Sequence, residues 1–166
     1  MSAFDELIRQ NEDDLSRYFQ RRFLSGTDAA DAFGELLLTA WRLRRKIPAD
    51  PTGGRMWLFA TARNVTLNSR RTVARQSAAV QRLADEMQTL TTTFPTDRAS
   101  MELREAIAAL PSDDAELVRL IYWDGLRSHE AAEVLGLNPS TARSRLAKAK
   151  QQLRSALGYG ENEGEH

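Results

Sequence analysis

The segment at residues 139–154 combines several cationic side chains with hydroxyl groups and contains no acidic residue. Arg and Lys side chains attract phosphate, and a carboxylate would repel it, so this composition favours contact with a nucleic acid. The alternative is that these side chains form an ordinary solvated face of a helix. The polar and basic residues of this segment are Thr141, Arg143, Ser144, Arg145, Lys148, Lys150 and Arg154.

A second polar pattern lies in the first half of the chain. Thr61, Asn64, Asn68 and Arg71 recur at intervals of three, four and three residues, which places them on one face of a helix. Asparagine offers both a hydrogen-bond donor and an acceptor, as recognition of a base edge requires. Trp57 begins this helix, where a base-stacking role and a place in the core are both open.

The basic segment follows the pattern of a helix-turn-helix. Ser128 is a candidate N-cap for a short helix, and Gly136 occupies the position where helices end in a left-handed residue. Asn138 can cap the next helix, and Pro139 suits its first position. The apolar residues of the second helix share one face of it; they are Ala142, Leu146, Ala149 and Leu153.

The rest of the first half is also predicted to be helical. A helix is expected over residues 3–24, with a possible break near Asn11, and a second with Thr27 or Asp28 as its cap. Two prolines and two glycines predict a loop at 47–54, and the next helix is predicted over 56–75 with Leu58, Ala62 and Val65 in the core.

In the second half, Ser100 is the predicted cap of a helix whose inward residues are Leu103, Ile107 and Leu110. Pro111 ends it, and Ser112 begins the next helix. We therefore predict an all-α fold of two small helical domains, at residues 1–75 and 100–158. A flexible linker at 76–99 joins them, and a disordered tail is expected at 159–166.

The formal net charge is zero, but the charges are segregated. Residues 41–75 carry nine Arg or Lys against Asp50 alone, whereas residues 1–40 and 76–138 are acidic. Two basic blocks predict a polyanion bound at two places, and the acidic faces suit a basic protein partner. The chain has no cysteine, and no apolar run is long enough to cross a membrane, so we expect a soluble cytoplasmic protein with neither a disulfide nor a thiolate metal site.

Nearly the whole chain resembles the extracytoplasmic-function group of bacterial RNA polymerase sigma factors. In the second half, Leu110 and Pro111 followed by LVRLIYWDGLRSHEAAEVLGLNPSTARSRLAKAKQQLR resemble region 4 of that group. In the first half, DAADAFGELLLTAW from Asp28 resembles its polymerase-binding segment, and WLFATARNVTLNSRR from Trp57 resembles its promoter-melting helix. The chain departs from the group pattern at Gly34, where glutamine is usual.

The resemblance implies a subunit that gives core RNA polymerase its promoter specificity and has no catalytic activity, metal or cofactor of its own. The partners that it implies are the clamp coiled coil of the largest polymerase subunit, the flap, promoter DNA and an anti-sigma factor. The implied polymerase-binding residues are Asp28, Asp31, Glu35 and Trp41. The implied residues for the promoter −10 element are Lys46, Arg55, Trp57, Thr61, Arg63, Asn64, Asn68, Arg70 and Arg71, with Asn64 contacting an extruded base. Those for the −35 element are Ser140, Thr141, Arg143, Ser144, Arg145 and Lys148.

Three alternatives stay open at this point. The acids Asp28, Asp31 and Glu35 have a simpler explanation as residues that favour a helix start. The chain could be a stand-alone helix-turn-helix regulator, although such a protein would not need the basic block at 41–75. The spacing of Glu102 with Glu105 and of Glu130 with Glu133 also allows an all-α metal-dependent hydrolase, which we consider remote.

Overall fold

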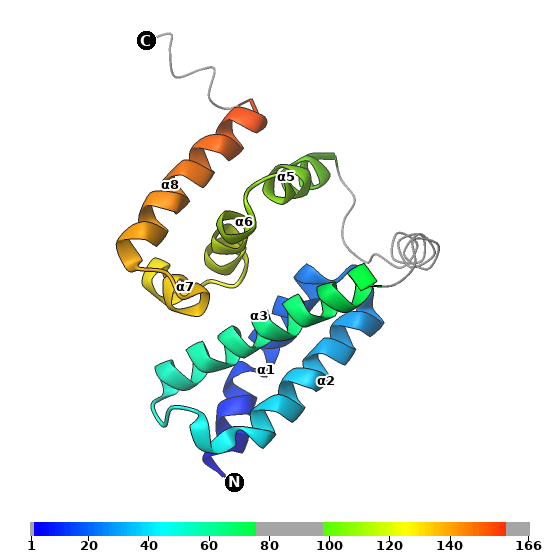
Figure 1. Ribbon diagram of the computed structural model, residues 1–166, viewed down its shortest axis with the longest axis vertical. Coiled ribbons are helices and arrows are strands. Elements are labelled where there is room, and N and C mark those ends of the chain that lie inside the picture. The colour runs from blue at the N-terminus through cyan, green and yellow to red at the C-terminus, as the bar shows by residue number, and fades with distance from the viewer. Residues whose placement is uncertain (1, 76–97, 159–166) are drawn as a thin grey trace. The chain divides into compact units, whose positions relative to one another are not determined.

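A computed structural model of the protein describes residues 2–75 and 98–158, and nearly all of these residues lie in helices (Figure 1). The all-α prediction is confirmed, because the described residues contain no strand. The chain divides after Thr93 into two compact units, here called the N-terminal unit and the C-terminal unit. Most of the predicted linker, and all of the predicted tail, lie outside the described residues. Arg98 and Ala99, assigned to the linker from the sequence, belong to a helix.

The N-terminal unit begins with α1 (Ala3–Arg22), a single unbroken helix. The Ser2 Oγ accepts the Asp5 backbone N–H at 3.1 Å, and the Ser2 side-chain hydroxyl donates to Asp5 Oδ2 at 2.8 Å. This hydrogen bond from Ser2 holds the pKa of Asp5 below its ordinary value. The predicted break near Asn11 is wrong, because the Asn11 Nδ2 donates to the Leu7 carbonyl at 2.8 Å within the helix instead of disrupting it.

Helix α2 (Gly26–Arg42) starts earlier than the sequence predicts. Its N-cap is Ser25, whose side chain accepts the Asp28 backbone N–H at 3.3 Å, so neither Thr27 nor Asp28 is the cap. Asp28 therefore lies in the first turn of α2, where the helix dipole favours a negative charge. After α2, a short 3-10 turn, η1 (Arg44–Lys46), leads toward the next helix.

Helix α3 (Pro51–Arg75) begins inside the segment that was predicted to be a loop. The Asp50 Oδ2 accepts the Gly53 backbone N–H at 2.7 Å and so satisfies one of the free amides of the first turn. Proline is compatible with the start of a helix, where its missing N–H costs no hydrogen bond. The loop is thereby shortened, and the first turn of α3 contains Gly53 and Gly54.

The core of the N-terminal unit forms where α1, α2 and α3 pack against one another in all three pairings (Figure 1). Its centre is aromatic: the Tyr18 ring meets the Phe19 and Phe59 rings edge to face at centroid distances of 5.3 and 5.7 Å. Leu58, Ala62 and Val65 are buried, as the helical spacing predicted. Burial of this apolar surface, at about 25 cal/mol per Å², is the main term that holds the three helices together.

Replacing either of two glycines of this unit with alanine should change the free energy of unfolding, and the two changes should have opposite signs. A Cβ at Gly53 would lie 2.6 Å from Asp50 Oδ1 and 2.9 Å from Pro48 Cβ, whereas a Cβ at Gly34 in α2 would meet no atom within 4 Å. We expect Gly53→Ala to displace the capping carboxylate and to lower the free energy of unfolding by about 1 kcal/mol or more. We expect Gly34→Ala to raise it by about 0.4–1 kcal/mol, because the unfolded chain loses entropy. Urea unfolding of the full chain measures both changes, and equal signs would contradict this prediction.

The C-terminal unit contains α5 (Arg98–Ala108), α6 (Ser112–Val118), the π-helical segment η2 (Arg119–Trp123), α7 (Ser128–Leu135) and α8 (Pro139–Ala156). Its core is a cluster of Ile107, Leu110, Ala115, Val118 and Ala149, with Trp123, Leu146 and Leu153 packed against it. Two predictions for α5 are wrong. The helix begins before Ser100, at Arg98, which forms an ion pair with Glu102 at 3.1 Å across the first turn. Leu103 is exposed, because α5 reaches the core only through its C-terminal end.

The helix-turn-helix is confirmed, with one correction at its start. Gly136 adopts a left-handed φ of 67° and ends α7, and the Asn138 side chain accepts the Ser140 backbone N–H at 3.0 Å to begin α8. The N-cap of α7 is Arg127 and not Ser128. The Glu130 carboxylate accepts the Arg127 backbone N–H at 2.9 Å, so the first turn is closed by an acid from inside the helix.

None of the described helices combines the length and the apolar character that crossing a membrane would require.

Candidate nucleic-acid interface

A cavity of about 460 Å³ opens on the N-terminal unit between α2 and α3. Trp57, Thr61, Asn64 and Asn68 line it, so the structure brings together four residues that the sequence predicted for one site. The volume exceeds that of a single nucleobase, and the lining combines one aromatic ring with amide and hydroxyl groups. Such a cavity can accept a flat base, stack it on an aromatic ring and hydrogen-bond its edge.

Helix α3 presents these residues because they recur on one of its faces. Asn64 and Asn68 are exposed, and the Thr61 hydroxyl donates to the Trp57 carbonyl at 2.8 Å, which fixes the Thr61 side chain against its own helix. Leu58, Ala62 and Val65 lie on the buried side of the helix. Asn64 and Asn68 therefore line the cavity on a helix whose opposite side is held in the core.

The opposite wall of the cavity is formed by Glu35 and Thr39 of α2 and by Leu43, the C-cap residue that follows the helix. These residues are spaced by four and so share a face of α2. Glu35 was predicted only as a polymerase contact, and Thr39 and Leu43 were not predicted as site residues. The spacing of four is visible in the sequence, but the sequence does not say which helix that face meets.

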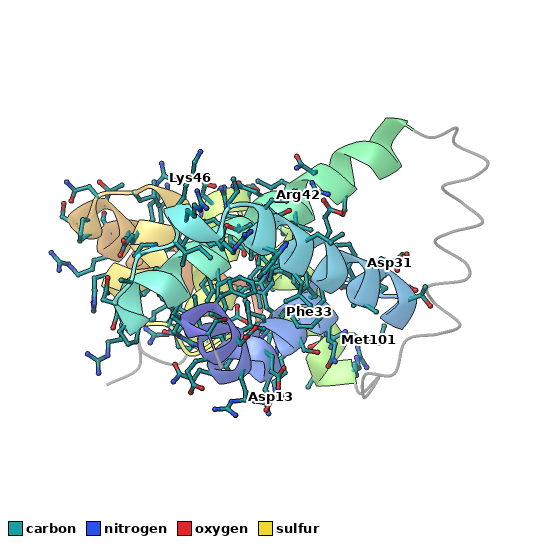
Figure 2. The ribbon with its side chains drawn as sticks, turned by 90° about the horizontal axis from the view of Figure 1, so that it is seen from below. Asp13, Asp31, Phe33, Arg42, Lys46 and Met101 are labelled. Carbon is teal, nitrogen blue, oxygen red and sulfur yellow. The ribbon has the colours of Figure 1, made fainter. Side chains whose placement is uncertain are left out.

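The basic block begins at the last residue of α2 and continues beyond it; its exposed residues there are Arg42, Arg44, Arg45 and Lys46. Arg44 lies over the Trp41 ring at 4.0 Å from its centroid and donates to the Trp41 carbonyl at 2.9 Å. Figure 2 shows Asp31 near one end of α2, with Arg42 at the other end and Lys46 just beyond it. The charge on α2 therefore changes sign along its length, and the cationic end could hold a phosphate backbone.

The remaining residues predicted for the −10 element occupy different environments. The Arg55 side chain is only 26% exposed and forms an ion pair with Asp14 at 2.9 Å. Arg63 is partly buried. The side chains of Arg70 and Arg71 lie outside the described residues, although both belong to α3.

The predicted polymerase contacts Asp28, Asp31, Glu35 and Trp41 are all exposed on α2. Trp41 is 51% exposed and meets the Phe4 ring of α1 edge to face at 5.5 Å. Leu38 is 54% exposed on the same helix. An exposed tryptophan and leucine near carboxylates form the kind of mixed surface that protein interfaces use.

In the C-terminal unit, α8 presents most of the residues predicted for the −35 element to solvent. Ser140, Thr141, Arg143, Ser144 and Lys148 are exposed, and Ala142 and Ala149 are fully buried on the opposite side. The Ser140 hydroxyl already donates to Asn138 Oδ1 at 2.8 Å, as part of the helix cap. A helix buried on one side and polar and basic on the other can enter a major groove.

Arg145 differs from the other predicted residues of α8. Its Nη1 lies 3.5 Å from Asp113 Oδ2 of α6, and its side chain is 43% exposed. Arg145 follows Ala142 by three residues, which places it near the buried side of the helix. It is therefore less directly presented to a ligand than Arg143 or Lys148.

One glutamate of each pair that suggested a metal site is engaged in a contact within its own helix or helix cap. Glu102 pairs with Arg98, and Glu130 accepts the Arg127 backbone N–H. In the part of the chain that the structure describes, no group of three His, Cys, Asp or Glu side chains is placed to hold a metal ion.

Comparison with known proteins gives matches in both units. The family model for sigma-70 region 2 matches residues 7–76, and that for sigma-70, region 4 matches residues 100–153. The ECF RNA polymerase sigma factor SigL of Mycobacterium tuberculosis is 29% identical over 147 residues, which cover 86% of this chain and 82% of SigL. The ECF RNA polymerase sigma factor SigE of Mycolicibacterium smegmatis is 28% identical over 162 residues, covering 95% of this chain and 62% of SigE.

Two solved structures share the fold. One is CnrH in complex with the cytosolic domain of CnrY, with a TM-score of 0.66 at 22% identity, covering 95% of this chain and 89% of CnrH. The other is the sigma factor RpoE in complex with the anti-sigma factor NepR from Bartonella quintana, with a TM-score of 0.66 at 20% identity, covering 94% and 99% of the two chains. Because a sigma-70 region 2 and a sigma-70 region 4 occur in this order, in a chain similar to ECF sigma factors over most of its length, the protein belongs to the extracytoplasmic-function group of RNA polymerase sigma factors.

Proposed function

We propose that the protein binds core RNA polymerase, directs it to promoters that carry a particular pair of −35 and −10 elements, and stabilises the melted −10 strand. The cavity between α2 and α3 is the observation that carries this proposal, because it gathers Trp57, Asn64 and Asn68 beside the basic end of α2. The chemistry of RNA synthesis is left to the polymerase, which works in the cytoplasm.

The energetic task of the cavity is to offset the cost of opening the duplex. Each base step costs on the order of 1.4 kcal/mol to unstack. A base stacked on an aromatic ring regains about 1–3 kcal/mol, so one or two trapped bases offset the opening of about two steps. Trp57 supplies the ring, Asn64 and Asn68 supply hydrogen bonds to the base edge, and Arg42 and Lys46 attract the phosphates.

Helix α8 is proposed to enter the major groove at the −35 element through Thr141, Arg143, Ser144 and Lys148. Two modest DNA contacts on one chain gain from their high effective concentration, and the spacing of the two promoter elements then acts as a geometric filter. A stand-alone regulator that uses only the C-terminal unit is the second candidate, and it leaves the cavity of the N-terminal unit without a role.

The face of α2 with Asp31, Leu38 and Trp41 is proposed to bind the clamp coiled coil of the polymerase. Sigma factors of the same fold have been solved with the anti-sigma factor NepR and with the cytosolic domain of CnrY, and we propose a protein inhibitor of this kind as a further partner. Exposed apolar residues that flank a DNA-binding or polymerase-binding surface are suitable contacts for such an inhibitor.

The test of the proposed function is transcription from a promoter library by core polymerase with and without the protein, followed by mapping of start sites. We expect starts that depend on the protein and that share two sequence elements at a fixed spacing. Failure of the full chain to associate with core polymerase would overturn the proposal. Transcriptional regulation by residues 98–158 alone would favour the stand-alone regulator.

The contact between Asp113 and Arg145 should restrain DNA binding. The pair is about half exposed, so it contributes on the order of 0–1 kcal/mol and is too weak to position α8, which the core cluster already holds. DNA phosphates compete with Asp113 for the Arg145 guanidinium. We therefore expect Asp113→Asn to raise the affinity of the holoenzyme for promoter DNA by up to about fivefold, with little change in the thermal midpoint. Fluorescence anisotropy measures the affinity, and a decrease would mean that the pair instead holds the helix in its binding position.

A further inference from the structure

Arg55 stands at the start of α3, but its guanidinium lies in the contact between α3 and α1. Its Nη1 donates to Asn11 Oδ1 at 2.8 Å and to Asp14 Oδ2 at 2.9 Å. The guanidinium carbon lies 4.9 Å from the centroid of the Phe59 ring, one turn further along α3. Arg55 therefore bridges two helices whose contacting residues are more than forty positions apart in the sequence.

The Asn11 acceptor of Arg55 is itself held in place. Asn11 is 4% exposed, and its Nδ2 donates to the Leu7 carbonyl, which turns its Oδ1 toward Arg55. An asparagine in the middle of a helix is unfavourable by propensity, so a buried one needs polar partners. Hydrogen bonds to a guanidinium are shorter and stronger than neutral ones, and this one is shielded from most of the solvent.

A close approach of the Gly54 backbone to a side chain of α1 supports the same contact. Gly54, the neighbour of Arg55, is buried, and a Cβ at this position would lie 2.9 Å from Leu7 Cδ1 of α1. The first turn of α3 is thus pressed against α1 by Gly54 and tied to it by Arg55. On the preceding side, the same turn is capped by Asp50.

We infer that Arg55 is a positioning residue for strand capture and that it acts through Asn11 and Asp14 instead of binding the DNA strand. This inference rests on the proposed function of the cavity between α2 and α3. Trp57, two residues after Arg55, lines that cavity, so the bond to α1 determines where the indole ring stands. The hydrogen bonds to Asn11 and Asp14 both use Nη1, so a phosphate could take Nη1 only by breaking them.

The experiment is a double-mutant cycle in the holoenzyme with Arg55→Ala and Asn11→Ala. The measurements are promoter opening, by permanganate reactivity of the −10 thymines, and the dependence of promoter affinity on salt. We expect each single variant to reduce opening by about tenfold, the scale of one hydrogen bond to a charged group, and the double variant to lose no more than either single one. The slope of log affinity against log salt should stay unchanged in Arg55→Ala, because no phosphate contact is lost.

The matched control is Arg45→Ala, which removes the same side chain from an exposed position in the same basic block. We expect this control to reduce the salt slope by about 0.7–0.9 and its effect to multiply with that of Asn11→Ala. The inference is overturned if Arg55→Ala behaves like Arg45→Ala, with a smaller salt slope and an effect that multiplies with Asn11→Ala.

Milder variants keep the test valid if an alanine variant does not fold, as judged by circular dichroism. Arg55→Lys retains a donor and Asp14→Asn retains an acceptor. Their effects on promoter opening should likewise be non-additive, and both should leave the salt slope unchanged.

The variant Asn64→Ala distinguishes failure of the positioning role of Arg55 from failure of the proposed function of the cavity. If it reduces opening while Arg55 and Asn11 act independently, only the positioning role of Arg55 fails. If Asn64→Ala is silent, the proposed function of the cavity fails.

Discussion

Replacing Asn64 with alanine is expected to reduce promoter opening by about tenfold to a hundredfold, because a well-placed amide contributes about 1–3 kcal/mol to discrimination of a base. Asn64 is exposed on α3 and lines the cavity with Trp57 and Asn68. Its loss leaves the buried side of α3 intact, so the affinity for core polymerase and the thermal midpoint should not change. Permanganate reactivity of the −10 thymines measures opening, and co-elution with core polymerase measures assembly.

The control for Asn64→Ala is Gln20→Ala, which removes an exposed amide from α1, outside the cavity. We expect Gln20→Ala to leave opening unchanged. Equal opening by the wild-type and Asn64→Ala holoenzymes, at a promoter that both bind, would remove the cavity from the mechanism.

The double variant Arg143→Ala/Lys148→Ala is expected to weaken binding of the −35 element more than any other change on α8. Both side chains are exposed on the basic face of the helix. If each neutralises one phosphate, the slope of log affinity against log salt falls by about 1.8, and affinity falls by at least about tenfold at moderate salt. Binding of the holoenzyme to a promoter fragment over a range of salt concentrations measures both quantities.

Arg154→Ala provides the comparison, since Arg154 is exposed in the last turn of the same helix. We expect it to change the slope less than the double variant, because residues near the start of a recognition helix lie closest to the DNA. If Arg154→Ala had the larger effect, the proposed docking of α8 by its N-terminal half would be wrong.

The sequence predicted the helix-turn-helix well because its signals are local. Gly136 ends α7 through its own positive φ, and Asn138 caps α8 by accepting an N–H two residues further on. Pro139 suits the first position of that helix. Ser128 was misjudged, since a serine and a nearby glutamate can both close a helix start and the structure uses Glu130. Local signals of this kind locate an element to within a residue or two.

The start of α3 could not be predicted in the same way. Two prolines and two glycines favour a loop by propensity, yet Pro51, Gly53 and Gly54 all lie in the helix. The cap from Asp50 and the contact of Gly54 with Leu7 outweigh that propensity, and the second of these depends on the fold of α1. Tertiary contact overrides local preference here.

The candidate site was predicted on α3 but only partly on α2. Thr61, Asn64 and Asn68 were recognised from their spacing, and they lie in the cavity together with Trp57, which was recognised as the aromatic residue that begins the helix. Arg55, in contrast, was assigned to the −10 element through the family resemblance, whereas its side chain is held by Asn11 and Asp14. Charge and periodicity do not reveal which cation has already found a partner on another helix.

Helix α2 has two separate faces, and this has a consequence for how such proteins can diversify. Glu35, Thr39 and the C-cap residue Leu43 line the cavity, whereas Leu38 and Trp41 are exposed on the helix. If the two faces have the roles proposed for them, substitutions at the first three positions alter which promoter is chosen, while the other two keep the attachment to an enzyme shared with competing subunits. A duplicated copy could thus acquire a new set of target genes in a few steps, without first losing its place on the common transcription machinery.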